Sequence, residues 1–240
     1  MLSLKDFAAQ CIGLSGDFSV VRNFFGHREG QPRTSSAGSG RQISLLDQIK
    51  GLQGHHIHLD IILVGSDQFL TGHKQDIDYA VFKTREIFAQ VHLGVGRIAH
   101  HHITTAEADG LEHIEKKKHY KKLGRKYRGS NDDAIDVFVV LDFDYEMDGE
   151  AKAGIAPIGI PDNKDIYHFD GVVMGIRSSG GVNQGAVKLG MLLAHELGHC
   201  LSLRHVDYPT NLMFPSSAGS GLSADQGADM RSHDYVQPGC

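Results

Sequence analysis

A histidine motif near the C-terminus constrains the fold more than any other feature of this chain. Residues 184–201 are apolar on nearly every side, which predicts a helix buried on all faces. This helix carries His195 and His199, four positions apart and therefore on one face, with Glu196 between them. His205 follows six residues after His199, so the helix must end and the chain must turn back for the three imidazoles to meet.

This pattern indicates a metal site. Two imidazoles at this spacing can bind one Zn²⁺, and the glutamate between them can stand beside a metal-bound water. No glutamate follows Glu196, which excludes the thermolysin-like class because that class needs a downstream glutamate ligand.

The sequence of residues 195–205, HELGHCLSLRH, followed by NLMFP at 211–215, resembles the metzincin clan of zinc endopeptidases. The spacing is similar to that of its matrixin, or matrix-metalloproteinase, branch. The resemblance implies that Glu196 is the general base and that Met213 is the Met-turn residue beneath the metal. It also implies one catalytic Zn²⁺ with three protein ligands: His195, His199 and His205.

The activity implied by the resemblance is zinc-dependent hydrolysis of internal peptide bonds in a protein or peptide substrate. The metal lowers the pKa of its water toward about 7. Glu196 takes the proton, the hydroxide attacks the peptide carbonyl, and zinc stabilises the oxyanion. Glu196 then passes the proton to the leaving amine.

Weaker similarities extend over about residues 57–235. Residues 154–161 carry two prolines and are expected to form an edge strand. His168-Phe169-Asp170 resembles the element before the catalytic helix, and LSADQ at 222–226 resembles the opening of the last helix. The matrixin strand that pairs with substrate corresponds to Gly154, Ile155, Ala156, Pro157 and Ile158.

The chain departs from the matrixin pattern at several positions. Ser202 replaces the glycine that usually ends the helix with a left-handed residue, and serine does so at some cost. Pro157 replaces the edge-strand histidine, which argues against a structural zinc site that uses His168. A cysteine-switch motif and an astacin-type tyrosine ligand are absent.

Hydrophobic periodicity places the remaining elements. Strands are expected from Ile57 and at 96–104, 134–143 and 169–177, and a helix at 75–92. Segment 134–143 reads as a buried central strand, with Ile135, Val137, Val139, Leu141 and Phe143 on one face. The expected class is α/β (α+β): a metzincin-like mixed twisted sheet with a backing helix, a buried active-site helix and a small C-terminal subdomain after the third zinc histidine.

Two regions are expected along the chain: an N-terminal helical extension at 1–55 and a catalytic domain at 56–240. The extension contains a Gly/Ser linker at 31–42. Its apolar residues must pack either on the body away from the zinc or in the substrate cleft, and we expect the first. Two roles are open for Cys11: an inhibitory thiolate that reaches the zinc, or the partner of Cys240 in a disulfide.

Charge is unevenly distributed. Residues 116–128 hold 8 of the 24 lysines and arginines and no acid, whereas 131–150 are rich in Asp and Glu. The basic segment is expected to be a solvated helix or loop, with contact to nucleic acid or an anionic surface as the alternative. The acidic segment leaves Ca²⁺ as an alternative cofactor. The alternative function is a non-catalytic zinc-containing binding protein that uses the basic segment.

Composition excludes several other classes. Three cysteines are too few for a disulfide scaffold, and the net charge of −5 provides no overall field for nucleic acid or an acidic membrane. Apolar runs are too short to span a bilayer. No Sec signal peptide is visible, so we expect a protein that stays in the cytoplasm, is exported by a non-Sec route, or has a precursor start outside this sequence. We expect the protein to be a monomer.

Overall fold

The computed structural model describes residues 54–127, 133–147, 150–159, 171–178, 181–216 and 219–239. Nearly all of the expected N-terminal extension, His168-Phe169-Asp170 and both Cys11 and Cys240 lie outside these residues.

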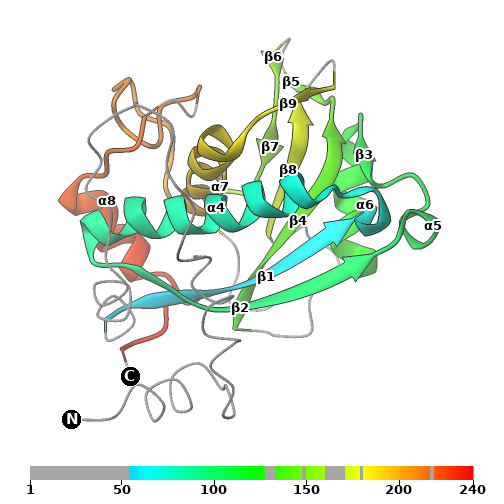
Figure 1. The fold of residues 1–240 in the computed structure, drawn as a ribbon. Helices are drawn as coiled ribbons and strands as arrows, with labels where there is room; N and C mark the ends of the chain where they lie inside the picture. Colours follow the sequence, from blue (N-terminus) through cyan, green and yellow to red (C-terminus); the bar gives the residue numbers. More distant parts are fainter. Residues whose placement is uncertain are drawn as a thin grey trace, which may run out of the picture.

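A mixed, twisted β-sheet forms the centre of the molecule (Figure 1). Four of its strands are parallel to their neighbours, and β7 is antiparallel to β8 at one end. In spatial order these strands are β2 (Gly94–Ile103), β1 (His56–Val64), β4 (Ala134–Phe143), β8 (Gly171–Ser178) and β7 (Gly154–Ile155). Two short strands pair alongside longer ones: β3 (His113–Ile114) with β4, and β9 (Val182–Asn183) with β8. Strands β5 (Glu146–Met147) and β6 (Glu150–Ala151) form a separate pair.

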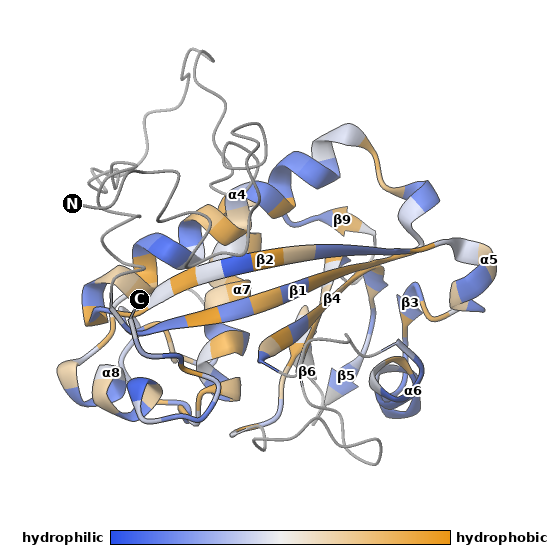
Figure 2. Ribbon diagram, turned by 90° about the horizontal axis from the view of Figure 1, so that it is seen from below, coloured by the Kyte–Doolittle hydropathy of each residue, from blue (hydrophilic) through white to orange (hydrophobic). Residues whose placement is uncertain are grey.

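Helices cover both faces of the sheet, as Figures 1 and 2 show. One face carries the long helices α4 (Thr71–Phe88) and α7 (Ala186–Cys200), with α8 (Ala224–Arg231) at its end. The other carries α5 (Thr105–Ala108) and α6 (Lys117–Tyr127). Two short 3₁₀ turns, Ser66–Gln68 and Ala89–Val91, flank α4. The backing helix and the buried active-site helix are therefore both present, and α4 begins four residues before the expected start.

Strand alternation divides the apolar side chains between two cores. In β1, Leu59 and Ile61 pack with α4 and α7, whereas Ile62 and Val64 pack with α6. Segment 134–143 is the buried central strand predicted from its pattern. Its last residue differs: Phe143 packs in the α6 core, next to Tyr145.

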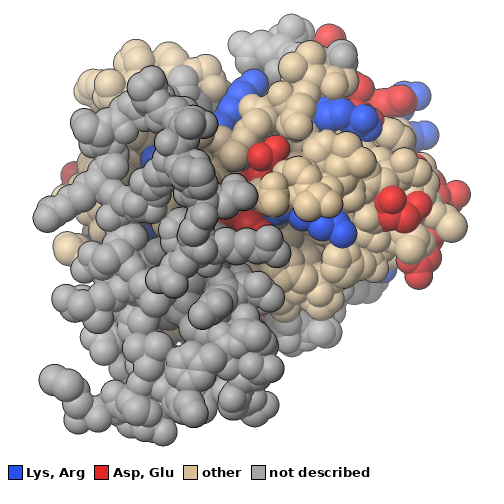
Figure 3. Space-filling view, viewed as in Figure 1, with Lys and Arg blue, Asp and Glu red and all other residues tan. Residues whose placement is uncertain are grey.

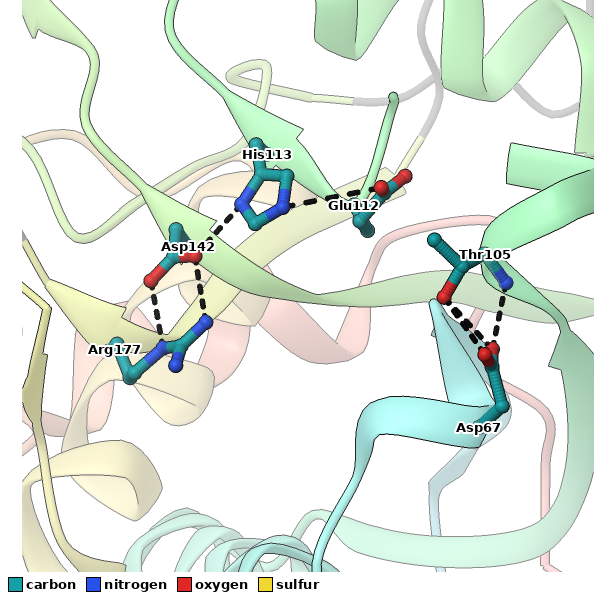
Figure 4. Close-up of polar contacts among 6 residues, drawn as sticks. All are labelled: Asp67, Thr105, Glu112, His113, Asp142 and Arg177. Atoms are coloured by element: carbon teal, nitrogen blue, oxygen red, sulfur yellow. Dashed lines mark hydrogen bonds and ion pairs between the residues drawn. The ribbon is translucent and has the colours of Figure 1, made fainter. Parts of the chain in front are cut away.

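Polar side chains join three strands at the carboxyl end of the sheet (Figure 4). Asp142 on β4 accepts a hydrogen bond from Nη2 of Arg177 on β8 at 2.7 Å, and its Oδ1 forms an ion pair with Nε of the same side chain, also at 2.7 Å. The same carboxylate lies 2.7 Å from Nδ1 of His113 on β3. Bidentate pairing of this kind fixes geometry as well as charge.

Among the described residues, no helix combines the length and the apolar character needed to cross a membrane.

Candidate metal centre

Helix α7 carries two of the three histidines, and its tight packing fixes their positions. Every residue from Leu192 to Cys200 is buried. Gly190 makes a close crossing with α4 possible, since a Cβ there would lie 2.6 Å from Cβ of Lys83. Cys200 packs as a small buried hydrophobic residue, as expected.

The end of α7 turns the chain back beneath the histidines. Ser202 adopts a left-handed conformation with φ of 74°, as its place in the motif predicts. The N–H groups of Ser202 and Leu203 donate to the carbonyls of His199 and Gly198, each at 2.9 Å. This is the Schellman pattern of helix termination, here formed without the usual glycine.

The third histidine arrives on the returning chain. The N–H of Val206, next to His205, donates to the carbonyl oxygen of Met213 at 3.1 Å. The Nε2 atom of His205 lies 3.2 Å from that of His195 and 3.1 Å from that of His199. Histidines ten residues apart in the sequence therefore converge at one point.

Hydrogen bonds determine which nitrogens face that point. Nδ1 of His195 lies 2.7 Å from the carbonyl oxygen of Leu212, and Nδ1 of His199 lies 2.8 Å from that of Leu203. A carbonyl can only accept, so both Nδ1 atoms carry the proton and both Nε2 atoms present lone pairs. A single proton on Nε2 of His205 cannot form hydrogen bonds to both of these lone pairs, whereas one cation can bind the lone pairs of all three imidazoles.

Burial keeps the two helical imidazoles neutral. It lowers the pKa of His195 to about 4, and it also lowers the pKa of His199. Neutral imidazole is the form that binds metal. The nitrogen donor set and the backbone carbonyls that orient it suit zinc.

Glu196 stands next to this cluster in a dry environment. Burial raises the pKa of its carboxyl group to about 8, while the charge of Lys152 and a hydrogen bond from the N–H of Ala156 lower it. A Cβ on Gly154 would lie 3.4 Å from Cγ of Glu196, so the edge strand passes close to the carboxylate. A buried carboxyl with a shifted pKa beside a metal-ligand cluster is typical of a catalytic site.

The expected edge strand lies along the same site. Only Gly154–Ile155 has strand pairing, with β8 on one side, and β7 ends the sheet path. Beyond Pro157, the N–H of Gly159 donates to the carbonyl of His199 at 2.8 Å. The segment 154–158 is thus held next to α7, and the Ile158 side chain is 49% exposed.

Met213, proposed from the sequence as a Met-turn residue, packs against Gly198 of α7. Its side chain is fully buried, and its Sδ would lie 2.7 Å from a Cβ on Gly198. Glycine within the motif therefore permits the close approach of the two segments. The side-chain carbonyl of Asn211 accepts a bond from the N–H of Met213 at 2.8 Å.

Sequence reasoning missed Lys152. Its positive charge lowers the pKa of both Glu196 and His195, so it lies near the metal centre. The available signal was its position two residues before Gly154, where the expected substrate strand begins.

Other proposed metal ligands gain no support from the described residues. There, only His195, His199 and His205 bring three or more ligand groups together. The described part of 131–150, the segment considered for Ca²⁺, forms no such cluster.

Comparison with known proteins agrees with this geometry. The matrixin family model matches residues 69–233, more than half of the chain. No curated protein matches the chain.

The chain is also similar to two solved structures. Metalloproteinase-II from Bacteroides fragilis has 16% identity and a TM-score of 0.48, covering 76% of this chain and 54% of that one. Archaemetzincin from Methanopyrus kandleri has 14% identity and a TM-score of 0.47, covering 73% and 94%. The chain thus spans about half the length of the Bacteroides protein. By its family match, this chain is a member of the matrixin family of zinc metallopeptidases.

Proposed function

We propose that this matrixin is an endopeptidase in which His195, His199 and His205 bind one catalytic zinc ion and Glu196 is the general base. One observation carries the proposal: in the described cluster, Nε2 of His205 lies 3.2 and 3.1 Å from those of His195 and His199, and the three ligand atoms lie within 4.8 Å of one another, next to a buried carboxyl group. When bound there, zinc supplies Lewis acidity toward water and a peptide carbonyl.

The residues of the chain divide the remaining work. The carbonyls of Leu212 and Leu203 orient the imidazoles of His195 and His199. Glu196 accepts a proton from water and delivers it to the leaving amine, with its carboxylate held by the N–H of Ala156. Met213 supports the cluster from below through its contact with Gly198.

Cleavage within a chain follows from the edge strand. β7 ends the described sheet path and has a strand neighbour, β8, on one side. An extended peptide can add to such an edge through backbone hydrogen bonds, and it does not need a free terminus to do so. We therefore propose residues 154–158 as the strand that aligns substrate over Glu196.

The first prediction concerns the base. Glu196→Ala should retain zinc, because the three imidazoles remain, and it should lose roughly 10²–10⁴ in kcat. The measurement is cleavage of a peptide blocked at both ends, with metal content determined on the same sample. A chelator should abolish wild-type cleavage and added zinc should restore it. Wild-type rates in Glu196→Ala would contradict the mechanism, and zinc binding without any cleavage would indicate a non-catalytic binding protein.

The second prediction concerns the third ligand. His205→Ala should weaken zinc binding and abolish cleavage, since two helical imidazoles alone leave the site incomplete. His233, which is in the same C-terminal region but outside the cluster, provides the matched control: His233→Ala should retain zinc. Equal zinc content in the wild-type and His205→Ala proteins would remove His205 from the ligand set.

A further inference from the structure

The exposed half of α6 carries a concentrated positive charge that the metal centre does not use. Residues 116–128 hold eight basic residues and no acid, which leaves 16 basic against 29 acidic residues, a net charge of −13, in the rest of the chain. In contrast, acidic and basic side chains are interspersed on the α4 face shown in Figure 3. The charge on α6 is therefore a local feature.

Helical geometry separates the two halves of α6. Tyr120, Leu123 and Gly124 are buried, and the first two pack in the second core beneath the helix. The basic residues occupy the opposite half and are all exposed: Lys117, Lys118, Lys121, Lys122, Arg125 and Lys126. In Figure 2, most of the α6 ribbon correspondingly has the colour of hydrophilic residues.

Only part of this charge is compensated within the described structure. Nζ of Lys122 lies 3.3 Å from Oδ2 of Asp109, and Nζ of Lys126 donates to the carbonyl of Glu107 at 3.0 Å. Lys117, Lys118 and Lys121 have no ion-pair partner among the described residues. These three lysines begin the helix and form a basic stripe on its exposed half.

The residues around the stripe favour a partner that contacts the stripe alone over one that covers the surrounding surface. Asp109 and Glu115 lie beside it and are both exposed, so a planar anionic membrane would also press against these carboxylates. The apolar half of α6 faces the protein core and cannot insert into lipid.

A long nucleic acid is also disfavoured. It would extend past the stripe and meet the field of the remaining chain, whose net charge is −13. Base stacking needs exposed aromatic rings, but Tyr120 is buried, and Nζ of Lys126 lies over the ring of half-buried Tyr127, 4.7 Å from its centroid. A short acidic segment of polypeptide needs no stacking, and it can lie along the stripe without extending over the acidic surface beyond it.

We propose that the exposed half of α6, centred on Lys117, Lys118 and Lys121, is a docking site for an acidic segment of a polypeptide. Given the proposed endopeptidase activity, on which this part rests, the site recruits protein substrates that carry such a segment. It lies on the opposite face of the sheet from α7, so it binds a part of the substrate remote from the cleaved bond.

Binding is tested on the full chain with the Glu196→Ala substitution, so that the result does not depend on cleavage. A fluorescein-labelled oligoglutamate peptide should bind, more weakly as salt rises, and an oligoglutamine peptide of equal length should not. Lys117→Gln/Lys121→Gln should weaken binding about fivefold, as expected for two exposed ion pairs. The exposed control pair Lys74→Gln/Lys188→Gln should leave it unchanged.

Equal binding by the two double variants would overturn the proposal, as would tighter binding of single-stranded DNA or of phosphatidylserine vesicles than of oligoglutamate. The active chain tests recruitment. An appended acidic tract should raise kcat/KM of a peptide substrate in the wild type and not in Lys117→Gln/Lys121→Gln, with equal rates on the peptide without the tract. Cleavage without any effect of the tract would refute recruitment and leave the endopeptidase intact, whereas absence of all cleavage with oligoglutamate still bound would refute only the endopeptidase.

Discussion

Burial acts in opposite directions on two neighbouring residues of α7. Removing His195 from water disfavours its charged form and lowers its pKa to about 4, which keeps the ring available as a ligand. The same desolvation disfavours the ionised form of Glu196 and raises its pKa to about 8. The chain therefore bears an energetic cost for holding an ionised carboxylate in this position, and a bound cation and the charge of Lys152 reduce that cost.

This cost predicts how the stability of the chelated protein depends on pH. Between pH 6.5 and 8 the unfolded chain has Glu196 ionised and loses the remaining proton population of His195, whereas the folded chain has His195 neutral and still holds the proton on Glu196. The unfolded state thus binds fewer protons, and the free energy of unfolding should fall as pH rises, by at most about 2 kcal/mol. Urea titrations across this range should show the fall in the chelated wild type and a flatter profile in Glu196→Gln. Identical profiles would contradict the assigned environment of Glu196.

At the scale of elements, α8 supports the metal centre through Asn211. Ser223 and Gln226 form a capping box at the start of α8, in the LSADQ segment where a helix was expected. The Gln226 side chain also exchanges two hydrogen bonds with the amide of Asn211, at 2.9 and 3.1 Å. Since Asn211 also holds the N–H of Met213, the cap of one helix positions the residue beneath the histidines.

Loss of this link should destabilise the C-terminal part of the domain. Gln226→Ala removes the capping interaction and leaves the Asn211 amide without these bonds, which should cost about 1–3 kcal/mol. Chemical denaturation measures the change, and zinc affinity should fall with it. Asp229→Ala, at an exposed position of the same helix, should alter stability by less than about 0.5 kcal/mol. Equal stability of the two variants would show that the link carries no energy.

At the scale of the whole molecule, the candidate metal centre joins a packed helix to the loop that follows it in the sequence. α7 packs against α4 and the sheet, whereas His205 and Met213 belong to the loop that leads to α8. A cation bound by all three histidines favours only the folded arrangement, because the unfolded chain does not bring them together.

Chelation should therefore lower the thermal midpoint of unfolding. With zinc at about 100 times its Kd, the expected stabilisation is about 2.7 kcal/mol, or about 5–11 °C for a domain of this size. Differential scanning calorimetry of the wild type with and without chelator measures the shift. In His205→Ala the same chelator should have little effect, and an equal shift there would place the stabilising metal elsewhere.

Local patterns were enough to predict much of the fold and the candidate ligands. The spacing of His195, His199 and His205 anticipated their convergence, and the apolar character of 184–201 anticipated a buried helix. The resemblance to the matrixin motif implied a left-handed residue at Ser202, and the φ of Ser202 is 74°. Each of these features depends on residues close together in the sequence, where helical geometry and motif spacing relate sequence to space.

Only the tertiary structure decided which distant groups surround those ligands. The contacts of Glu196 with Gly154 and Ala156, the influence of Lys152 and the link from Gln226 to Asn211 all join segments separated by loops. The packing of Phe143 in the second core was likewise not apparent from strand alternation. No periodicity records such contacts, because they depend on how the sheet orders its strands and on which face each helix covers. The pKa values of Glu196 and His195 depend on burial by the assembled layers, so the sequence determined which groups could act and the fold determined their charge.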